Sequence, residues 1–561
     1  MKYAFLLFFI GFYSFGQDYP KDYFNAPLNI PLDLSGSFGE LRSNHFHSGL
    51  DLKTKNKTGL PVLAVADGYV SRIKISTWGY GKAIYVNHPN GFTSVYGHLE
   101  SANGTIEQTI HQKHYVEKAF EIELFFKPKE LPVKKGEIIA FSGNSGGSGG
   151  PHLHFEIRDT RTENIINPLL FGFDKFVVDT FRPKINSVLV YPMNDSIAIN
   201  NAYKPQNIQL TINAQGNYVA NKITTNGAIG FSLNTYDNMT NSYNKNGIYK
   251  VSTFVNGVSY FSYKFDTFSF DESKHINFFI DYFRYKNLKQ RFQKMFMDAA
   301  YPLSIVNQNQ KDGVLHVQPA ASYIYKIVVE DFSQNKTVVE IPVVHKKQNI
   351  VQNDVAITGK KIKAKNEYIF EEDFCTVTFP SNTFYEDFNI KMNVKDGVLY
   401  LHEDEIPVKN SFTVSFDVSN LDEKIKNKSF IANVNGKYIS YCKSYLNKNK
   451  IYSKVKKLGV YKVVQDTIAP KIYAANFTTD KIIDSYKNLS VKISDDGSGI
   501  DSYTAYLNDK WILMEYDYKT KKLTHNLSDQ IYVIGKNDFK LVVTDEMNNS
   551  TIFESRFYKN N

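Results

Sequence analysis

Short runs of Tyr, Phe, Ile, Val and Thr, broken by Asn, Asp, Gly and Lys, recur along almost the whole chain. β-Branched and aromatic side chains favour strands, and the residues that interrupt the runs favour turns. The pattern therefore predicts a mostly β protein with many short strands. Aromatic residues make up 15% of the sequence, which excludes a disordered chain because such chains contain few of them.

The chain has 561 residues and is too long for one compact domain. A weak internal repeat indicates how the chain after residue 175 is divided. Residues 179–185 resemble residues 466–472, and residues 328–337 resemble residues 542–551. We expect each pair to mark the first and last strands of one β-sandwich (Ig-like) module. The expected division is a signal peptide at 1–16, a small antiparallel β domain at 17–175, a β-sandwich module with a long insertion at 176–346, a β-rich module at 347–465 and a C-terminal β-sandwich module at 466–561.

The first residues are typical of a secretory signal peptide. Lys2 precedes the apolar run Ala4–Phe15, and small residues lead to a cleavage point before Gln17. The run is short for a transmembrane span, although an uncleaved anchor is the alternative. No later segment is long and apolar enough to cross a bilayer, so we expect a mature chain without a transmembrane segment. Its expected location is the periplasm or cell envelope of a bacterium, or the exterior.

The net charge of +9 is modest for this length, and the lysines are dispersed. A nucleic-acid-binding protein more often carries a basic stripe, so nucleic acid is not an expected partner. The charge suits either loose attraction to an anionic envelope or simple solubility. The two cysteines, Cys375 and Cys442, are permitted to pair by export, but two separate buried thiols fit the sequence equally.

Strands alternate with tight turns before about residue 175. Residues 61–66 and 69–73, joined by an Asp-Gly turn, predict one hairpin, and residues 82–86 and 92–96 predict a second. Further strands are expected at 137–142 and 152–157. The glycine-rich segment between these two predicts a loop.

Histidine and aspartate side chains recur at the ends of these strands. His47 and Asp51 lie four residues apart in a segment that enters a strand, and His98 ends another strand. His152 and His154 share one strand face because alternate residues of a strand point the same way. A catalytic zinc takes three N or O ligands and leaves a position for water. Peptide hydrolysis also needs a proton acceptor and a stabilised oxyanion. A pair of histidines, His98 and His152, beside a metal centre of His47, Asp51 and His154 meets these needs.

These residues stand in a recurring set of short motifs. The motifs are Arg42, His47-Ser48-Gly49-Leu50-Asp51, Pro61-Val62, Ala66-Asp67-Gly68, Gly79-Tyr80-Gly81, Tyr96-Gly97-His98-Leu99, Val133-Lys134-Lys135-Gly136 and Gly150-Pro151-His152-Leu153-His154-Phe155-Glu156. Through them, residues 36–159 resemble the lysostaphin-type, LytM-like zinc endopeptidases. The resemblance implies a small antiparallel β fold with a narrow groove. It also implies one Zn²⁺ per chain held by His47, Asp51 and His154, with His98 and His152 as the catalytic histidines.

Other side chains are expected near this site. Glu156 shares the strand face of His154, and we expect it to hydrogen-bond a ligand or a catalytic histidine; a surface salt bridge is the alternative. Tyr80 and Tyr96 are expected to line the groove, with core packing as the alternative. His45, two residues before His47, is a candidate to fill the open metal position in a latent state.

The segment 100–131 is longer than the link that the family usually has between its motifs, and we expect this insertion to cap or reshape the groove. Its two histidines, His111 and His114, are expected to be exposed to solvent rather than to bind metal. Residues 495–501, which combine aspartates with glycines, predict a plain turn, with calcium binding as the alternative.

The resemblance supplies the expected function. It implies an exported zinc endopeptidase that hydrolyses peptide cross-links of bacterial peptidoglycan, with metal-activated water as the nucleophile. A non-catalytic relative that binds peptidoglycan or activates another hydrolase is one alternative, and a peptidase of glycine-rich secreted proteins is another. The β modules after residue 176 carry no catalytic pattern and are expected to bind an envelope partner or to act as spacers.

Overall fold

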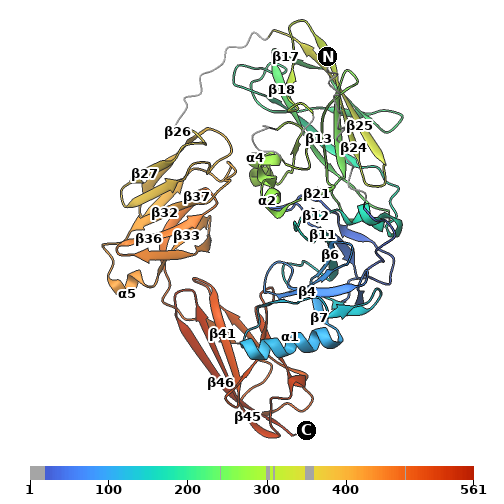
Figure 1. Cartoon of the computed structure of the whole chain (residues 1–561). Coiled ribbons are helices and arrows are strands. Elements are labelled where there is room, and N and C mark those ends of the chain that lie inside the picture. The colour runs from blue at the N-terminus through green and yellow to red at the C-terminus, as the bar shows by residue number, and fades with distance from the viewer. Residues whose placement is uncertain are drawn as a thin grey trace, which may run out of the picture.

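The computed structural model describes residues 19–240, 242–297, 303–307, 310–347, 359–473 and 475–560. The predicted signal peptide, residues 1–16, lies outside these ranges. The described residues form mostly antiparallel sheets, as the sequence predicts. Four β-rich parts follow one another along the chain and are arranged around a circle (Figure 1). Within the described ranges, no helix has both the length and the apolar character that a membrane span requires.

The N-terminal part is built on a large sheet with the strand order β1-β2-β11-β6-β5-β4-β8. These strands are β1 (Leu34–Gly36), β2 (Leu50–Lys53), β11 (His152–Asp159), β6 (Phe92–Gly97), β5 (Lys82–Asn87), β4 (Gly68–Ile75) and β8 (Ile122–Phe125), with β9 (Pro132–Val133) beside β4 and β12 (Ile165–Ile166) beside β11. A smaller sheet contains β3 (Pro61–Leu63), β10 (Ile138–Ser142) and β7 (Leu99–Ala102). The two sheets enclose one apolar core.

One of the two predicted hairpins is confirmed. β5 and β6 pair directly, with Ile84 opposite Tyr96. The hairpin predicted over residues 61–73 is wrong, because β3 pairs with β10 of the small sheet while β4 pairs with β5 of the large one. After β3 the backbone of Ala64 bonds to Glu137 and Gly136. These bonds extend the pairing of β3 with β10, so the chain crosses from the small sheet to the large one before β4 begins, and β3 and β4 do not pair.

The second part is a sandwich of two sheets. One sheet contains β13 (Lys184–Pro192), β14 (Gln206–Asn207), β18 (Ala228–Tyr236), β22 (Gln293–Lys294) and β23 (Leu315–His316). The other contains β15 (Leu210–Ile212), β16 (Tyr218–Ala220), β17 (Ile223–Thr225), β19 (Lys250–Val255), β20 (Val258–Lys264), β24 (Ser322–Glu330) and β25 (Lys336–His345). Between β20 and β22 lie β21 (Thr267–Phe268) and the short helices α2 (Phe270–Ser273), α3 (Ile276–Phe279) and α4 (Tyr282–Leu288). β21 pairs with β12, and the cores of the first two parts form one apolar cluster.

The third and fourth parts are sandwiches with separate cores. The third contains β26 (Lys360–Ile362), β27 (Tyr368–Glu372), β28 (Cys375–Phe379), β29 (Phe388–Ile390), β30 (Met392–Lys395), β31 (Val398–Leu401), β32 (Phe412–Asp417), α5 (Glu423–Lys426), β33 (Ser429–Asn435), β34 (Tyr438–Cys442), β35 (Ser444–Asn447), β36 (Lys450–Val455) and β37 (Gly459–Gln465). The fourth contains β38 (Lys471–Tyr473), β39 (Lys481–Ile482), β40 (Asn488–Ser494), β41 (Ile500–Leu507), β42 (Lys510–Ile512), β43 (Glu515–Asp517), β44 (Lys522–Asn526), β45 (Gly535–Asp545) and β46 (Ser550–Lys559). Cys375 and Cys442 are both free thiols.

Contacts between successive parts close the circle. The ring of Phe278 in α3 stacks on Tyr385 of the third part with centroids 4.7 Å apart. Tyr441 of the third part donates a hydrogen bond to Glu546 of the fourth. The fourth part then reaches back to the first, where its strands lie beside the helix α1 (Gly104–Glu117) (Figure 1).

Candidate metal centre and active site

The side chains of His47, Asp51 and His154 meet at the junction of β2 and β11. Asp51 in β2 lies directly opposite His154 in β11, and opposed residues of antiparallel strands hold their Cβ atoms about 4.5–5.5 Å apart. Asp51 Oδ1 is 3.0 Å from His47 Nε2 and 2.9 Å from His154 Nδ1, and these two nitrogens are 3.2 Å apart. The three residues that were predicted from the sequence to bind a metal therefore lie together in the fold.

Each of the three side chains is held by a second contact. His47 Nδ1 donates to the carbonyl of Ser37 at 2.8 Å, which leaves Nε2 unprotonated and facing the centre. Asp51 Oδ2 accepts a bond from Arg42 Nη2 at 2.9 Å, which leaves Oδ1 facing the histidines. Burial opposes ionisation of Asp51, but the neighbouring imidazoles hold the pKa of this carboxyl well below its usual value.

Glu156 orients His154, the third predicted metal ligand. It is fully buried and accepts a hydrogen bond from His154 Nε2 at 2.8 Å, which directs His154 Nδ1 at the centre. Ser48 and Tyr80 each donate to Glu156 Oε1 at 2.5 Å. The Arg158 guanidinium donates to Glu156 Oε2 at 2.7 Å from Nε. Burial raises the pKa of Glu156, but Arg158 and His154 outweigh it, so the pKa lies well below its usual value and the carboxylate stays charged.

The donor set suits zinc. Zn–N distances of about 2.0–2.1 Å and Zn–O distances of about 2.0–2.2 Å in a tetrahedral site separate neighbouring ligand atoms by about 3.3 Å. The three separations here, 2.9, 3.0 and 3.2 Å, are close to that value. Two imidazole nitrogens and one carboxylate oxygen match the ligands of catalytic zinc sites, which keep the fourth position open.

His98 and His152 lie beside this centre, with ring centroids 4.8 Å apart. Nδ1 of His98 donates to the Ser145 carbonyl and Nδ1 of His152 donates to the Gly150 carbonyl, each at 2.8 Å. Nε2 of His152 is buried 3.4 Å from Asp51 Oδ1 and has no hydrogen-bond partner among the described residues. This orphaned nitrogen fits a centre that also holds a metal and its water.

The backbone of His98 is strained and its ring is neutral. Its φ of 59° lies in the left-handed region that non-glycine residues seldom adopt, and such strain persists where the surrounding structure enforces it. The backbone N–H of His98 bonds to the carbonyl of Tyr80 at 2.8 Å. Burial, with the neighbouring His154 and His152, lowers the pKa of His98 to about 3. The ring therefore stays neutral at physiological pH and can accept a proton.

The centre lies in a groove of about 740 Å³. The first part supplies most of the lining, including Tyr80, which the sequence predicts there. The second part adds a wall that the sequence does not predict: Phe270, Ser273, Lys274 and Arg291. The wall is fastened by the backbone N–H of Phe46, which donates to Ser273 Oγ at 2.7 Å.

Of the two expectations for Tyr96, core packing is confirmed and groove lining is wrong. Its side chain is fully buried in the core, and its hydroxyl accepts a hydrogen bond from the backbone N–H of Val65 at 3.0 Å. Every residue of β6 after Phe92 is buried, so both faces of this strand are covered. Tyr96 lies on the face that packs against the apolar core. His45 also stays outside the centre, because its ring bonds to Asn44 Oδ1 at 2.7 Å and is not part of the three-residue group.

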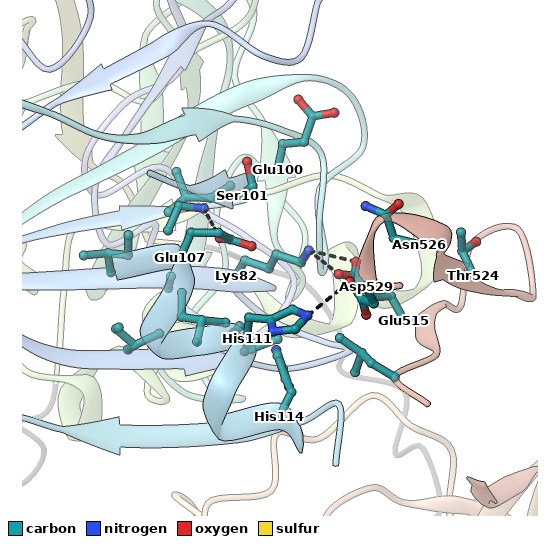
Figure 2. Close-up of a pocket in the computed structure, with 18 of the residues that line it drawn as sticks. Lys82, Glu100, Ser101, Glu107, His111, His114, Glu515, Thr524, Asn526 and Asp529 are labelled. Atoms are coloured by element: carbon teal, nitrogen blue, oxygen red, sulfur yellow. Dashed lines mark hydrogen bonds and ion pairs between the residues drawn. The ribbon is translucent and has the colours of Figure 1, made fainter. Parts of the chain in front are cut away.

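The insertion 100–131 forms α1 and β8 and contributes no residue to the groove lining. The prediction that it caps the groove is therefore wrong. It contacts the fourth part instead, across a second cavity of about 430 Å³ (Figure 2). There His111 Nε2 is 3.1 Å from Asp529 Oδ1, and Lys82 Nζ is 2.8 Å from Glu515 Oε2 (Figure 2).

The two histidines of this insertion differ. His111 is exposed, as predicted, with 46% of its side chain accessible. The prediction that His114 is exposed is wrong, because it is only 3% exposed. His114 lies on the inner face of α1 with Ile106 and Ile110. Its Nδ1 donates to the carbonyl of Ala119 at 2.8 Å, which satisfies the ring at the end of the helix.

Comparison with known proteins gives two family matches. Residues 45–122 match the family described as peptidase family M23, and residues 359–466 match a Zu5-like domain. The DD-carboxypeptidase/endopeptidase Mpg of Neisseria meningitidis serogroup B is 32% identical over 143 residues, which are 25% of this chain and 27% of that protein. The murein hydrolase activator EnvC of Escherichia coli K12 is 33% identical over 112 residues, 20% of each chain.

Solved structures show similarity over the same part of the chain. The catalytic domain of the antimicrobial peptidase lysostaphin from Staphylococcus simulans is 24% identical, with a TM-score of 0.19, and the match covers 25% of this chain and 89% of that one. The chain thus spans about a quarter of the curated relatives' own length. His47, Asp51 and His98 lie within residues 45–122, the segment that matches peptidase family M23, whereas His152 and His154 follow it.

Proposed function

We propose that the chain is an exported zinc endopeptidase that hydrolyses peptide cross-links of bacterial peptidoglycan, on the premise that its residues 45–122 match peptidase family M23. One observation carries the proposal. Three zinc-type donor atoms converge within 3.2 Å of one another beside two histidines, in an open groove. The two neighbouring histidines would be superfluous in a purely structural metal site, which is closed by four protein ligands.

Zinc bound at this centre supplies Lewis-acid chemistry, because it polarises a carbonyl and lowers the pKa of a water molecule. The residues of the chain perform the remaining tasks. His47, Asp51 and His154 would hold the ion, and Glu156 and Ser37 fix the ring orientations of the two histidines. His98, which is neutral, accepts a proton and can return it to the leaving amine. His152 places Nε2 at the same point and, because its Nδ1 donates to the Gly150 carbonyl, can accept a hydrogen bond from the attacking water.

The proposed substrate class rests on the relatives and on the charge of the groove. Two relatives are a DD-carboxypeptidase/endopeptidase and a murein hydrolase activator, and murein is another name for peptidoglycan. The groove lining includes three cationic side chains: Arg42, Lys274 and Arg291. Peptides of peptidoglycan carry free carboxylates, and cationic groove walls attract and orient such groups.

A non-catalytic activator is the second candidate, because EnvC is named as an activator. The complete set of donor atoms and the orphaned Nε2 of His152 favour the enzyme. A chain that only binds another hydrolase has no need of either feature. Metal analysis separates the two candidates, since an activator without bound zinc would still bind its partner.

The test is digestion of purified cell-wall sacculi by the mature chain, followed by mass spectrometry of the released muropeptides. We expect the wild type to hold one zinc per chain and to release soluble fragments. His154→Ala is expected to lose both properties. His316→Ala, which changes an exposed histidine outside the groove, is the matched control and should retain both. Equal release by wild type and His154→Ala would overturn the proposal.

A further inference from the structure

A second group of acidic side chains lies where the second part meets the first. Asp179, Asp237 and Asp331 place carboxylate oxygens within 4.8 Å of one another. Asp237 directly follows β18 and Asp331 directly follows β24, while Asp179 precedes β13. All three lie at one end of the sandwich. They line a cavity of about 40 Å³ whose opposite wall comes from the first part, through Leu34, Phe38 and Leu169.

Polar atoms in this cavity lack partners. Asp237 and Asn246 are each 3% exposed. Among the described residues, neither Oδ1 of Asp237 nor either amide atom of Asn246 has a hydrogen-bond partner. The two residues face each other across an antiparallel bridge, with N–H···O distances of 2.9 and 2.8 Å, so both side chains point to the same side. Burying polar atoms without partners costs free energy, so a bound species that contacts them is indicated.

The charge of the cavity indicates what that species is. Within the described part of the chain, no Lys or Arg forms an ion pair with Asp179, Asp237 or Asp331. The oxygens of three carboxylates and one amide thus surround a space too small for a side chain but large enough for an ion and a water molecule.

The fourth part provides an internal comparison, because its Asp466, Asp495 and Asp545 hold equivalent positions. The same contacts between an asparagine and an aspartate hold the cluster in both parts. Asn335 bonds to both carboxylate oxygens of Asp331, and Asn549 bonds in the same way to Asp545, at 2.7–2.9 Å. The internal repeat in the sequence therefore reflects a repeated local structure.

The two clusters differ in their hydrogen-bond donors. In the fourth part the loop 495–499 folds over the carboxylates. Ser498 donates two bonds of 2.7 Å to Asp466 Oδ2, and the backbone N–H groups of Gly497 and Gly499 donate to Asp495 Oδ1. A Cβ at Gly497 would lie 2.2 Å from Asp466 Oδ2, so the loop backbone fills the space between the carboxylates. This supports the plain turn predicted over residues 495–501, whereas in the second part the space remains open.

From these contrasts we propose that Asp179, Asp237, Asp331 and the side-chain oxygen of Asn246 bind a calcium ion at the junction of the first and second parts. Calcium prefers carboxylate and amide oxygens and accepts irregular geometry with water as an extra ligand. Zinc favours nitrogen and sulfur, and magnesium requires near-ideal octahedral geometry. The site is therefore distinct in chemistry from the centre formed by His47, Asp51 and His154.

The ion would also act on the orientation of a zinc ligand. Ser37 lines the cavity, and its Oγ accepts a hydrogen bond of 2.9 Å from the N–H of Gly247, the neighbour of Asn246. The carbonyl of the same Ser37 holds the His47 ring. An ion that fixes Asn246 thus fixes the segment that orients His47, and it joins the peptidase part to the sandwich behind it.

The test uses the full mature chain with one equivalent of zinc, in buffer passed over a chelating resin. Calcium chloride is titrated to 10 mM, binding is measured by isothermal titration calorimetry, and the midpoint temperature of unfolding (Tm) is measured in parallel. We expect one ion per chain, with a Kd between about 10⁻⁶ and 10⁻³ M. Saturation should raise Tm by about 5 °C.

Two isosteric variants locate the ion. Asp237→Asn should lose at least tenfold in calcium affinity, yet without calcium its Tm should equal or exceed that of the wild type, because a neutral amide of the same shape replaces an acidic group that is buried beside two other carboxyl groups. That pattern separates loss of the site from loss of the fold. Asp495→Asn, in the matched cluster, should bind calcium like the wild type. No binding at 10 mM, unchanged binding by Asp237→Asn, loss of binding by Asp495→Asn, or an equal response to magnesium would each overturn the proposal.

Discussion

Replacing Glu156 by Gln removes a buried charge on which both a metal ligand and an ion pair depend. The carboxylate is fully buried and contacts His154 through one oxygen and Arg158 through the other. An amide has a single accepting oxygen, so it can serve only one of the two. We therefore expect two separable losses, one in folding stability and one in zinc affinity.

The stability loss is estimated from the Arg158 side chain, of which only 4% is exposed. Removing one partner of a buried ion pair costs about 3–5 kcal/mol, because the other charge is left uncompensated. Glu163 remains 3.1 Å from Arg158 Nη1 and is half exposed, so it compensates in part. The expected decrease in the free energy of unfolding is therefore at the lower end, about 3 kcal/mol. Loss of the acceptor for His154 Nε2 should weaken zinc binding by about 10–100-fold.

Guanidinium denaturation of the metal-free chain measures the first quantity, and competition with a chromogenic zinc chelator measures the second. The double variant Glu156→Gln/Arg158→Met separates them, since it removes both charges of the ion pair and should recover most of the stability while zinc affinity stays low. Glu163→Gln, at an exposed partner, is the control and should cost at most about 1 kcal/mol. If the double variant regained zinc affinity together with stability, the carboxylate would not act by orienting His154.

Three further predictions concern other parts of the chain. His98→Ala should reduce kcat by about 10²–10⁴-fold while zinc content, measured by atomic absorption, stays at one per chain; a parallel loss of zinc would contradict a proton-transfer role. Burial lowers the pKa of His88 from 6.5 to about 4, so the free energy of unfolding should fall by roughly 3 kcal/mol as the pH drops from 6.5 to 4. The free energy of unfolding of His88→Gln should depend less steeply on pH over this range, and an unchanged slope would refute the reasoning. Tyr115→Phe removes the hydroxyl that donates to Asp529 at 2.5 Å and should speed amide hydrogen exchange in α1, whereas Tyr243→Phe, on an exposed ring, should not.

Local patterns in the sequence predict the strands of the site well. The alternation in β11 places His152, His154 and Glu156 on one face, because side chains of a strand alternate. The second hairpin is also local, since its strands adjoin a turn with the right residues. These features depend on a few neighbouring residues, and the chain needs no distant partner to specify them.

Features that depend on distant partners were not predictable in this way. The 61–73 hairpin fails because Pro61–Leu63 finds its partner in β10, more than seventy residues later. His114 follows Ile106 and Ile110 at a spacing of four, which places it on their face of α1, but the surface that this face packs against comes from elsewhere in the fold. The groove wall of Phe270, Lys274 and Arg291 comes from an insertion whose aromatic content indicates burial but not which surface it covers.

The contact between the fourth part and the first includes the ring pair Trp78–Tyr518, the ion pair Lys82–Glu515 and the hydrogen bond from Tyr115 to Asp529. Surface contacts of this kind each contribute little free energy, and two separate proteins joined by them alone would dissociate readily. Here the chain runs through the second and third parts and returns, so the two surfaces meet at an effective concentration in the millimolar range. Weak complementarity between the two surfaces is then sufficient to keep them in contact, because the covalent connection has already met most of the entropic cost of association. The same patch on an isolated C-terminal module would have no measurable affinity for the peptidase part in trans.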